Sequence, residues 1–474
     1  MKHSVKLAAL SIAFCANVFA DPVYLPPASN LTYGASSNNQ SIMSSVTNPA
    51  AAAAQLGKED SQYRFGILSS IGGGYEFGNV NDLYNQIDGS KNTITAPMTP
   101  ADLQAKYIAA GCTASCTPAQ STAFVNDVVA TINTSAAVTT LNNTILPALR
   151  KDGNATVFFG GHVPLMPFVI TKQNWGGSFV LDANASVIAN MSFIDDPLLI
   201  STAVATTLAN NYAAYQSSGS TAAFNNYPAI TNDSTLLVKA AVVAELGLGY
   251  SRQLMKKETG DLAAGARLKY YQVKLARDAQ KLTNSTGAQN TFKATQTYSS
   301  SSGVGVDLGT LWTARRYRVG AWVNNINGPS FKYNSIDTTV LAYAGTNVPN
   351  QLSADQDYKM KPQVEMEGAF YSESQNWVLN VALDANAVPD PVGRDFQWAT
   401  LSAAYATDSW WIPGIRLGYR SNLAGSKLSY ATAGLTMFKA FSLDVAYGMD
   451  SIKDNQGNSI PRSAMLNLGM QMTF

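Results

Sequence analysis

Few residues in this sequence have the types and spacing that covalent chemistry requires. A side-chain nucleophile needs a general base within hydrogen-bond reach, and His162 is the only histidine beyond residue 20. A lone histidine is more often structural than catalytic. Glu365 and Glu367 share one parity of an alternating segment, where pairing with arginine is favoured over catalysis. We therefore expect a protein with no enzyme activity and no catalytic residue.

The glycine clusters and cysteines give weak signals for a cofactor or a metal. Gly72-Gly73-Gly74 and Gly303-Val304-Gly305 do not open a helix after a strand, so close backbone packing is favoured over a phosphate loop. Cys112 and Cys116 are predicted to form a local disulfide in an oxidising compartment. A metal site is the alternative, but the sequence offers no further ligands nearby. We expect no metal and no cofactor.

The composition indicates strands that alternate between two environments. The 474 residues are 46% hydrophobic and only 13% charged, whereas about a quarter of the residues in a soluble protein are charged. No run of about 18 apolar residues follows the N-terminal region, which excludes a helical membrane protein. The net charge of +1 argues against a nucleic-acid partner. Low charge without long apolar runs predicts apolar residues spread along membrane strands.

Residues 1–20 have the pattern of a cleaved secretory signal. Lys2 and Lys6 precede an apolar core, and Val18-Phe19-Ala20 forms a small-x-small cleavage site. We expect the exported chain to begin at Asp21 and to reach the outer membrane of a Gram-negative cell.

The end of the chain carries the clearest strand signal. From Arg462 onward, apolar side chains alternate with small or polar ones. Such alternation over about ten residues is the mark of a strand with one face in lipid, and a terminal aromatic residue is typical of bacterial outer-membrane barrels. The residues expected to direct barrel insertion are Leu468, Met470, Met472 and Phe474.

Similar segments recur and predict an all-β membrane protein, a barrel of about fourteen antiparallel transmembrane strands. Long connections follow the odd-numbered strands and mostly short ones follow the even-numbered strands, as expected when long loops lie outside the cell. The parity changes near Tyr270-Tyr271, which predicts a β-bulge or a strand end there. The predicted strands are 61–78, 154–172, 174–190, 236–252, 262–277, 302–314, 316–326, 362–372, 374–386, 397–407, 412–421, 427–438, 440–450 and 462–474.

Charged residues within these segments keep to the polar parity. A lysine or arginine that faces lipid at mid-membrane costs about 2–4 kcal/mol, so these side chains should face the lumen. The predicted lumen-facing charges are Arg64, Lys239, Glu245, Arg267, Lys269, Asp307, Arg318, Glu365, Glu367, Asp384, Arg416, Arg420 and Asp444.

Aromatic residues near the predicted strand ends are placed where interfacial girdles would need them, although aromatic residues also favour strands in general. The predicted girdle residues are Trp312, Trp398, Trp410, Trp411 and Tyr447.

Two long connections and the stretch before the first strand are further candidates for function. The connections at about 79–153 and 191–235 contain predicted helices, and loops of this length are commonly lids or binding loops. The alternative is packing that merely roofs the barrel. Residues 21–60 are polar and rich in small residues, so they could fill the lumen as a hatch or plug, or hang in the periplasm. Residues 61–474 then form the barrel.

The hatch stretch contains Asn48-Pro49-Ala50. Here the sequence resembles the FadL superfamily of outer-membrane barrels for hydrophobic compounds, whose N-terminal hatch carries an Asn-Pro-Ala motif and whose barrels have about fourteen strands. Over nearly all of the exported chain it is similar to the outer-membrane family described as conjugal-transfer TraF-like, on segments such as 303–309 and 324–331. That name comes from a thioredoxin-like plasmid protein, whereas this chain has no Cys-x-x-Cys.

These resemblances imply two alternative functions. The first is a passive channel or binding protein for hydrophobic small molecules, gated by the hatch around Asn48, Pro49 and Ala50. The second is a structural or accessory component of conjugal transfer or of another cell-surface apparatus. An apolar pocket with a few polar anchors would favour the first, and a sealed lumen with an exposed apolar patch the second. The expected partners are outer-membrane lipids, the barrel-assembly and periplasmic chaperone machinery, and a hydrophobic ligand.

Overall fold

The computed structural model describes residues 22–34, 41–54, 61–81, 100–112, 116–198, 206–207, 210, 232–281, 298–341, 343, 345–407, 409–453 and 457–473. The predicted signal segment 1–20 and Phe474 lie outside these residues, as do parts of the predicted hatch and of the connection 191–235.

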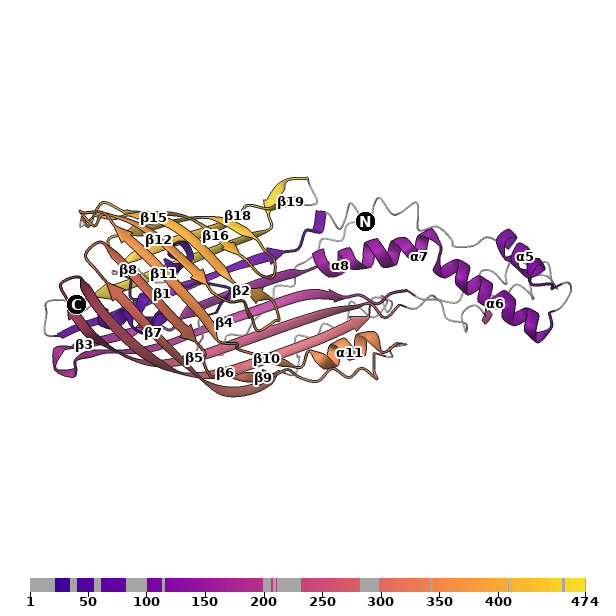
Figure 1. Ribbon diagram of the computed structural model, residues 1–474, viewed down its shortest axis with the longest axis horizontal. Helices are drawn as coiled ribbons and strands as arrows, with labels where there is room; N and C mark the ends of the chain where they lie inside the picture. Colours follow the sequence, from indigo (N-terminus) through magenta and orange to yellow (C-terminus); the bar gives the residue numbers. More distant parts are fainter. Residues whose placement is uncertain are drawn as a thin grey trace.

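Fourteen antiparallel strands form a closed barrel, as the alternating pattern predicted (Figure 1). β2 and β3 count as one strand of the wall, because both pair with β1 on one side and with β4 on the other. The barrel closes where β1 pairs with β21. In order around the barrel the wall strands are β1 (Ser61–Phe77), β2 (Ala155–His162) with β3 (Phe168–Lys172), β4 (Gly177–Ile194), β5 (Thr235–Lys257), β6 (Gly260–Lys281), β7 (Ser299–Thr313), β8 (Tyr317–Asn324), β11 (Gln363–Tyr371), β12 (Trp377–Asp384), β15 (Trp398–Tyr405), β16 (Gly414–Asn422), β17 (Ser429–Met437), β18 (Phe441–Gly448) and β21 (Ser463–Thr473).

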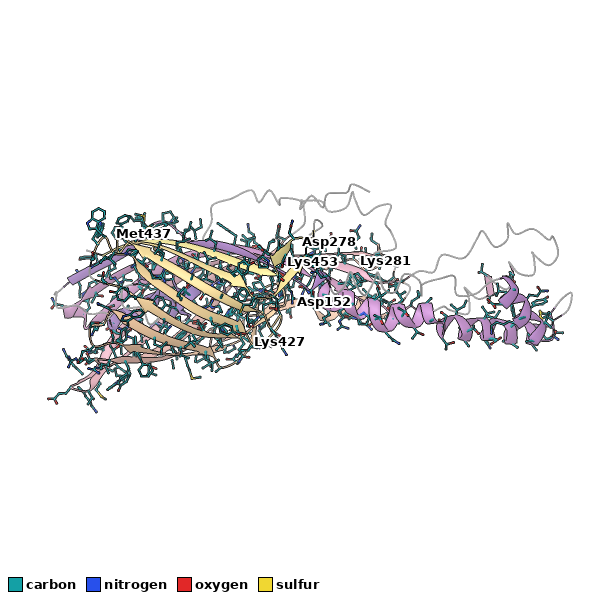
Figure 2. All side chains as sticks on the ribbon, turned by 90° about the horizontal axis from the view of Figure 1, so that it is seen from above. Asp152, Asp278, Lys281, Lys427, Met437 and Lys453 are labelled. Carbon is teal, nitrogen blue, oxygen red and sulfur yellow. A yellow bond between two sulfur atoms is a disulfide. The ribbon has the colours of Figure 1, made fainter. Side chains whose placement is uncertain are left out.

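The two ends of the barrel carry connections of different length. Figure 2 places Lys427 and Lys453 at the end from which helices extend, here called the outer end, and Met437 toward the opposite, inner end. At the inner end the connections are short, such as 314–316 between β7 and β8 and 438–440 between β17 and β18. At the outer end three short strand pairs and one helix lie in the connections: β9 (Ser330–Lys332) with β10 (Asp357–Lys359), β13 (Val388–Pro389) with β14 (Asp395–Phe396), β19 (Ser451–Lys453) with β20 (Ser459–Pro461), and α11 (Asn347–Ala354).

The connection between β1 and β2 forms a helical arm that projects beyond the outer end (Figure 1). Its elements are α5 (Pro100–Ala109), α6 (Pro118–Asn133), α7 (Ala136–Thr140), η1 (Leu141–Ile145) and α8 (Leu146–Asp152). Thr117 and Gln120 form a capping box at the start of α6, which satisfies backbone N–H groups that the first turn leaves without partners. Leu103, Phe124 and Val128 pack together as the arm's own core. No helix among the described residues has the length and apolar character needed to cross a membrane.

The wall shows an apolar outer surface. Leu248, Phe370 and Leu417 are more than half exposed on the outward parity of their strands. Contact with lipid accounts for this exposure, which a soluble surface would not sustain over a whole barrel.

One predicted strand is interrupted. The segment 154–172 is divided into β2 and β3 by residues 163–167, which include Pro164 and Pro167. A proline has no N–H for the strand ladder, and this explains the break. Leu165 N donates to the Ile67 carbonyl at 3.3 Å and Gly66 N to the Pro167 carbonyl at 3.2 Å, so the wall stays hydrogen-bonded across the break.

The bulge predicted near Tyr270-Tyr271 is absent. The β5–β6 register runs without a shift from Thr235↔Lys281 to Gln253↔Ala263, and the irregularity lies after Gln253 instead. Tyr271, Val273 and Leu275 are buried on the lumen parity, where Tyr271 contacts Phe331 of β9. The alternation along β6 keeps its phase here, but the polarity of its two faces reverses. Beyond the membrane the outward face meets water, while the inward face packs against the outer connections.

The aromatic prediction was wrong at one position. Trp410, Trp411 and Tyr447 are exposed, as a membrane interface requires, and Trp312 is partly buried. Trp398 is 6% exposed and lies inside the lumen, because its ring packs beneath the Arg420 guanidinium.

Candidate functional site: the occupied barrel lumen

Residues 22–34 and 41–54, here called the plug segment, lie inside the barrel. They include the short helices α1 (Asn30–Tyr33), α2 (Ser44–Thr47) and α3 (Ala51–Ala54). α1 contacts the wall strands β12 and β15 to β18, and α3 contacts β3 to β7. Tyr24 and Leu31 are fully buried. The plug segment therefore spans the lumen from one side of the wall to the other.

Wall side chains hold the plug backbone through hydrogen bonds. Arg420 Nη2 donates to the Asn30 carbonyl at 3.0 Å, and Thr32 Oγ1 donates to Asp444 Oδ1 at 2.6 Å. The four-residue α1 leaves most of its carbonyls without partners inside the helix, and buried carbonyls need donors. Further wall donors to plug carbonyls are Asn380 to Tyr33, Trp398 to Val23 and Asn467 to Pro26.

The motif Asn48-Pro49-Ala50 holds a second part of the plug segment against β6, β7 and β8. Asn48 Nδ2 donates to the Thr310 carbonyl at 3.2 Å, and its Oδ1 accepts from the Ala50 N–H at 2.9 Å. Side chains added to β6 or β7 at this point would overlap the Pro49 carbonyl or the Asn48 amide. The motif approaches three neighbouring strands this closely because each has a glycine there: Gly265, Gly309 and Gly320.

A first group of predicted charges connects the wall to this anchor. Arg267 forms an ion pair with Glu245 and lies 3.6 Å from Asp307, measured from Nε to Oδ2. Lys269 Nζ lies 2.8 Å from Asp307 Oδ1. Arg267 also donates to the Val46 carbonyl of the plug segment. Each buried charge thus has an opposite charge beside it, which burial in the lumen requires.

A second group lies on the neighbouring wall strands β11, β12, β15 and β16. Glu365 and Asp384 face each other across β11 and β12. Asp384 Oδ2 accepts from Gln363 Nε2 at 2.9 Å and from the Trp398 backbone N–H at 2.7 Å. The Arg420 guanidinium stacks 4.8 Å from the Trp398 ring centroid. Arg420 connects this group to α1 of the plug segment through the Asn30 carbonyl.

The remaining predicted charges are distributed around the lumen. Lys239 pairs with Asp355 of the outer connection, and Arg416 pairs with Asp444 at 2.7 Å. Arg64, Arg318 and Glu367 are buried at other positions of the wall. Of the thirteen predicted charges, Glu365 alone is partly rather than fully buried. Several of these charges thus form ion pairs with one another or with neighbouring segments inside the lumen.

The other predicted residues lie apart from the plug segment. His162 is buried with Nε2 3.5 Å from Asp182 Oδ1. Cys112 and Cys116 are joined in a disulfide between α5 and α6 of the arm. Leu468, Met470 and Met472 belong to β21 and pair with β1 at the barrel seam. Within the described residues, no three His, Cys, Asp or Glu side chains are grouped so that they could hold a metal ion.

The plug segment separates two cavities. The outer cavity has a volume of about 150 Å³ and is lined by wall and plug residues that include Tyr24, Asn30, Tyr271, Trp398 and Arg420. The inner cavity has a volume of about 430 Å³ and is lined by plug residues that include Ser29 and Tyr33 and by the inner-end turns. Residues of α1 contribute to both linings.

Sequence reasoning missed the connection between β12 and β15, which enters the lumen. Asp390, Val392 and Phe396 are buried there, although the sequence suggested an ordinary loop. The signal that could have found it is apolar spacing: Val388, Val392 and Phe396 recur every four residues in a short connection.

Several solved structures resemble this chain at low identity. They include the TodX deltaS2S3 mutant, a monoaromatic hydrocarbon channel, with 9% identity over 90% of this chain and 93% of that chain and a TM-score of 0.35. CdiB from Acinetobacter baumannii has 7% identity over 67% and 50%, with a TM-score of 0.26. The closed form of the ferric-catecholate import receptor Fiu from E. coli K12 has 9% over 67% and 55%, with a TM-score of 0.22. The chain thus spans about half the length of the last two.

No match was found among curated proteins. A family model described as "F plasmid transfer operon, TraF, protein" matches residues 45–384, from α2 in the plug segment to the last residue of β12. This match covers most of the barrel wall together with the Asn48-Pro49-Ala50 anchor. The chain therefore belongs to this TraF family of the F plasmid transfer operon.

Proposed function

We propose that this protein is an outer-membrane channel for small hydrophobic or amphipathic compounds, closed in this conformation by the plug segment. The observation that carries the proposal is the position of α1 between the outer and inner cavities, both of which it lines. Passage would be binding and permeation, with no covalent step. The Asn48-Pro49-Ala50 motif, in which the sequence resembles FadL barrels, supports the same function.

The outer cavity supports a ligand with an apolar body and a few polar groups. Tyr271, Trp398 and Met360 provide apolar surface, while polar groups come from Asn30 and from six charged side chains: Glu245, Arg267, Lys269, Glu365, Asp384 and Arg420. Small-molecule sites usually combine such a lining with a small number of polar anchors. Its volume of about 150 Å³ corresponds to a compound the size of one aromatic ring with substituents.

The plug segment is built so that it can move. Its three helices have four residues each and would not be stable alone, so their order depends on contacts with the wall. Each hydrogen bond from the wall contributes about 0.5–1.5 kcal/mol net, which a ligand in the outer cavity could replace. We propose that residues 22–34 move while Asn48, Pro49 and Ala50 stay seated on the wall glycines.

A reversible crosslink tests this proposal. In a Cys112→Ser, Cys116→Ser background, Thr32→Cys with Asp444→Cys would join α1 to β18, where Thr32 Oγ1 and Asp444 Oδ1 are 2.6 Å apart. We expect uptake of small aromatic solutes into liposomes by the reduced protein and at least a tenfold loss after oxidation. The same variant before and after oxidation is its own control, because both states lack Asp444. Equal uptake in the two states would contradict gating by α1.

A second candidate function is an accessory role in conjugal transfer or another surface apparatus. The helical arm favours it, because α5 and α6 extend away from the barrel and carry their own core instead of roofing the lumen (Figure 1). The description of the family points the same way. In a plasmid-bearing host, deletion of residues 100–152 should then lower DNA transfer at least tenfold and leave solute uptake unchanged. Unchanged transfer would remove this candidate.

A further inference from the structure

The connection of residues 385–397 between β12 and β15, here called the crossing loop, is folded into the lumen. β13 and β14 form its two short strands. Asp390 is 0% exposed and Phe396 is 2% exposed. Connections normally run over the surface, because a buried loop must find partners for its polar groups. The burial of Asp390 therefore indicates that this loop occupies a specific position in the lumen.

The crossing loop reaches the opposite side of the barrel. Arg394 forms an ion pair with Glu76 of β1 and donates to Thr156 of β2. The loop joins β12 and β15, and these strands lie five to seven steps from β1 and β2 around a barrel of fourteen strands. The Arg394 side chain thus ties the crossing loop to the wall that faces its own strands.

Three further contacts hold the loop in this position. Tyr333 beyond β9 donates to the Pro391 carbonyl. Asp390 Oδ1 accepts from the backbone N–H groups of Val392 at 2.9 Å and Arg394 at 2.8 Å, which fixes the turn. Lys239 of β5 approaches the loop closely enough that its Nζ would lie 3.3 Å from a Cβ at Gly393.

The crossing loop also contacts the start of the plug segment. The Phe396 ring lies 6.4 Å from the Tyr24 ring, and Trp398 Nε1 donates to the Val23 carbonyl at 2.8 Å. Pro391 lines the outer cavity together with Tyr24. The outer cavity is therefore bounded by the plug segment toward the inner end and by the crossing loop toward the outer end.

We propose that the crossing loop is a second barrier in series with the plug segment, and that it selects by size and charge the solutes that reach the outer cavity. This inference rests on the proposed channel function. Arg394 sets the selection in two ways: it holds the loop across the lumen, and it neutralises Glu76. Loss of Arg394 would widen the outer entrance and leave a carboxylate facing the path, which favours cations over anions.

Single-channel recording in planar bilayers can separate the two barriers. Four proteins are compared: the full chain, a variant lacking residues 21–55, a variant lacking 388–395, and a variant lacking both. Removal of 388–395 leaves the connection Ala385, Asn386, Ala387, Phe396 and Gln397, long enough for an ordinary hairpin. The control removes the nine residues 452–460, which eliminates most of the β19–β20 pair at the same end of the barrel.

The proposal predicts low conductance without 388–395 alone, higher conductance without 21–55, and at least a further twofold rise when both are removed. Removal of 452–460 should change nothing in either background. If conductance rises without 21–55 but not further without 388–395, the crossing loop is no barrier and the plug proposal stands. If removal of 388–395 alone opens the channel and removal of 21–55 does not, the plug proposal fails instead. If no variant conducts more, both fail.

A point variant keeps the test valid if the shortened loop prevents folding. In the variant lacking 21–55, Arg394→Ala should shift the reversal potential in a salt gradient toward cation selectivity, with at least a twofold change in the permeability ratio. Arg150→Ala is the control, because Arg150 is largely exposed and pairs with Asp195 beside the helical arm, away from Glu76 and Arg394. An unchanged ratio for Arg394→Ala would overturn the assignment of selectivity to this residue.

Discussion

Arg267 illustrates how single side chains hold the lumen together. It pairs with Glu245, lies beside Asp307 and donates to the Val46 carbonyl of the plug segment. Alternation along its strand indicated that Arg267 faces inward, because a charge facing lipid is costly. Alternation did not indicate which carbonyl it meets, since that depends on how an irregular segment folds inside the closed wall.

Removal of Arg267 should destabilise both the wall and the plug segment. Arg267→Met leaves Glu245 and Asp307 buried with less positive charge, and breaking a buried ion pair typically costs about 3–5 kcal/mol. We expect a loss of unfolding free energy of this size in urea titrations of the protein in lipid vesicles. Arg252→Met on the exposed end of β5 is the control and should change stability by less than about 0.5 kcal/mol. If Arg267→Met lowers the unfolding free energy no more than Arg252→Met does, the ion-pair cluster around Arg267 contributes nothing to stability.

The wall glycines that the Asn-Pro-Ala motif packs against give a second prediction for single residues. A Cβ at Gly309 would overlap the Asn48 amide, and such overpacking costs about 1–3 kcal/mol. We expect Gly309→Ala to loosen the plug segment, so that added protease cleaves within 22–54 several-fold faster. Gly368→Ala is the matched control, because a Cβ there meets no atom within 4 Å. Unchanged cleavage of the Gly309 variant would contradict the anchor.

At the scale of elements, the sequence predicted the wall strands well and the irregular parts poorly. Alternation located every strand because each has one face in lipid, and this pattern depends on the residues of the strand alone. Alternation predicted a bulge or a strand end in β6 that is absent. The surroundings of the outward face change there from lipid to water, so the polarity of the two faces reverses without a bulge. It also missed the crossing loop, whose burial depends on contacts with β1, β2 and β5 that are distant in sequence.

The crossing loop should respond to pH through Asp390. Burial raises the pKa of Asp390 to about 7 from an ordinary value of 3.8, against the lowering effect of the Arg394 and Val392 N–H groups and of Lys239. Tyr24, Tyr333 and Tyr358 also face this carboxylate, and burial raises the pKa of each phenol further from neutrality.

A carboxyl whose pKa is higher in the seated loop binds its proton more tightly there than when the loop is released. The seated position is therefore favoured fully only below the ordinary pKa of 3.8. It loses this advantage as the pH rises toward about 7, and none is left at higher pH. In the variant lacking 21–55, we expect higher conductance at pH 8.5 than at pH 5.5. Asp390→Asn should abolish the difference, and a pH dependence that survives this substitution would assign it to another group.

Across the whole molecule, the interior of the barrel has two parts that differ in the side chains that line them. Toward the anchor, paired charges and glycines fix the plug segment to β6, β7 and β8. Toward the outer end, aromatic residues of the plug segment, the wall and the outer connections enclose the outer cavity. The sequence could indicate a closed barrel with something inside it, but the cavities arise from the assembled packing of segments far apart in the chain.

The central claim is that the plug segment closes the channel. Its most direct test is the single-channel conductance of the protein lacking residues 21–55, compared with that of the full chain in the same planar bilayer and salt. Both proteins must first show the same strand content by circular dichroism, since the wall contributes nearly all of it. We expect a conductance at least several-fold higher for the shortened protein, because the outer and inner cavities then join. Equal conductance in the two proteins would contradict it.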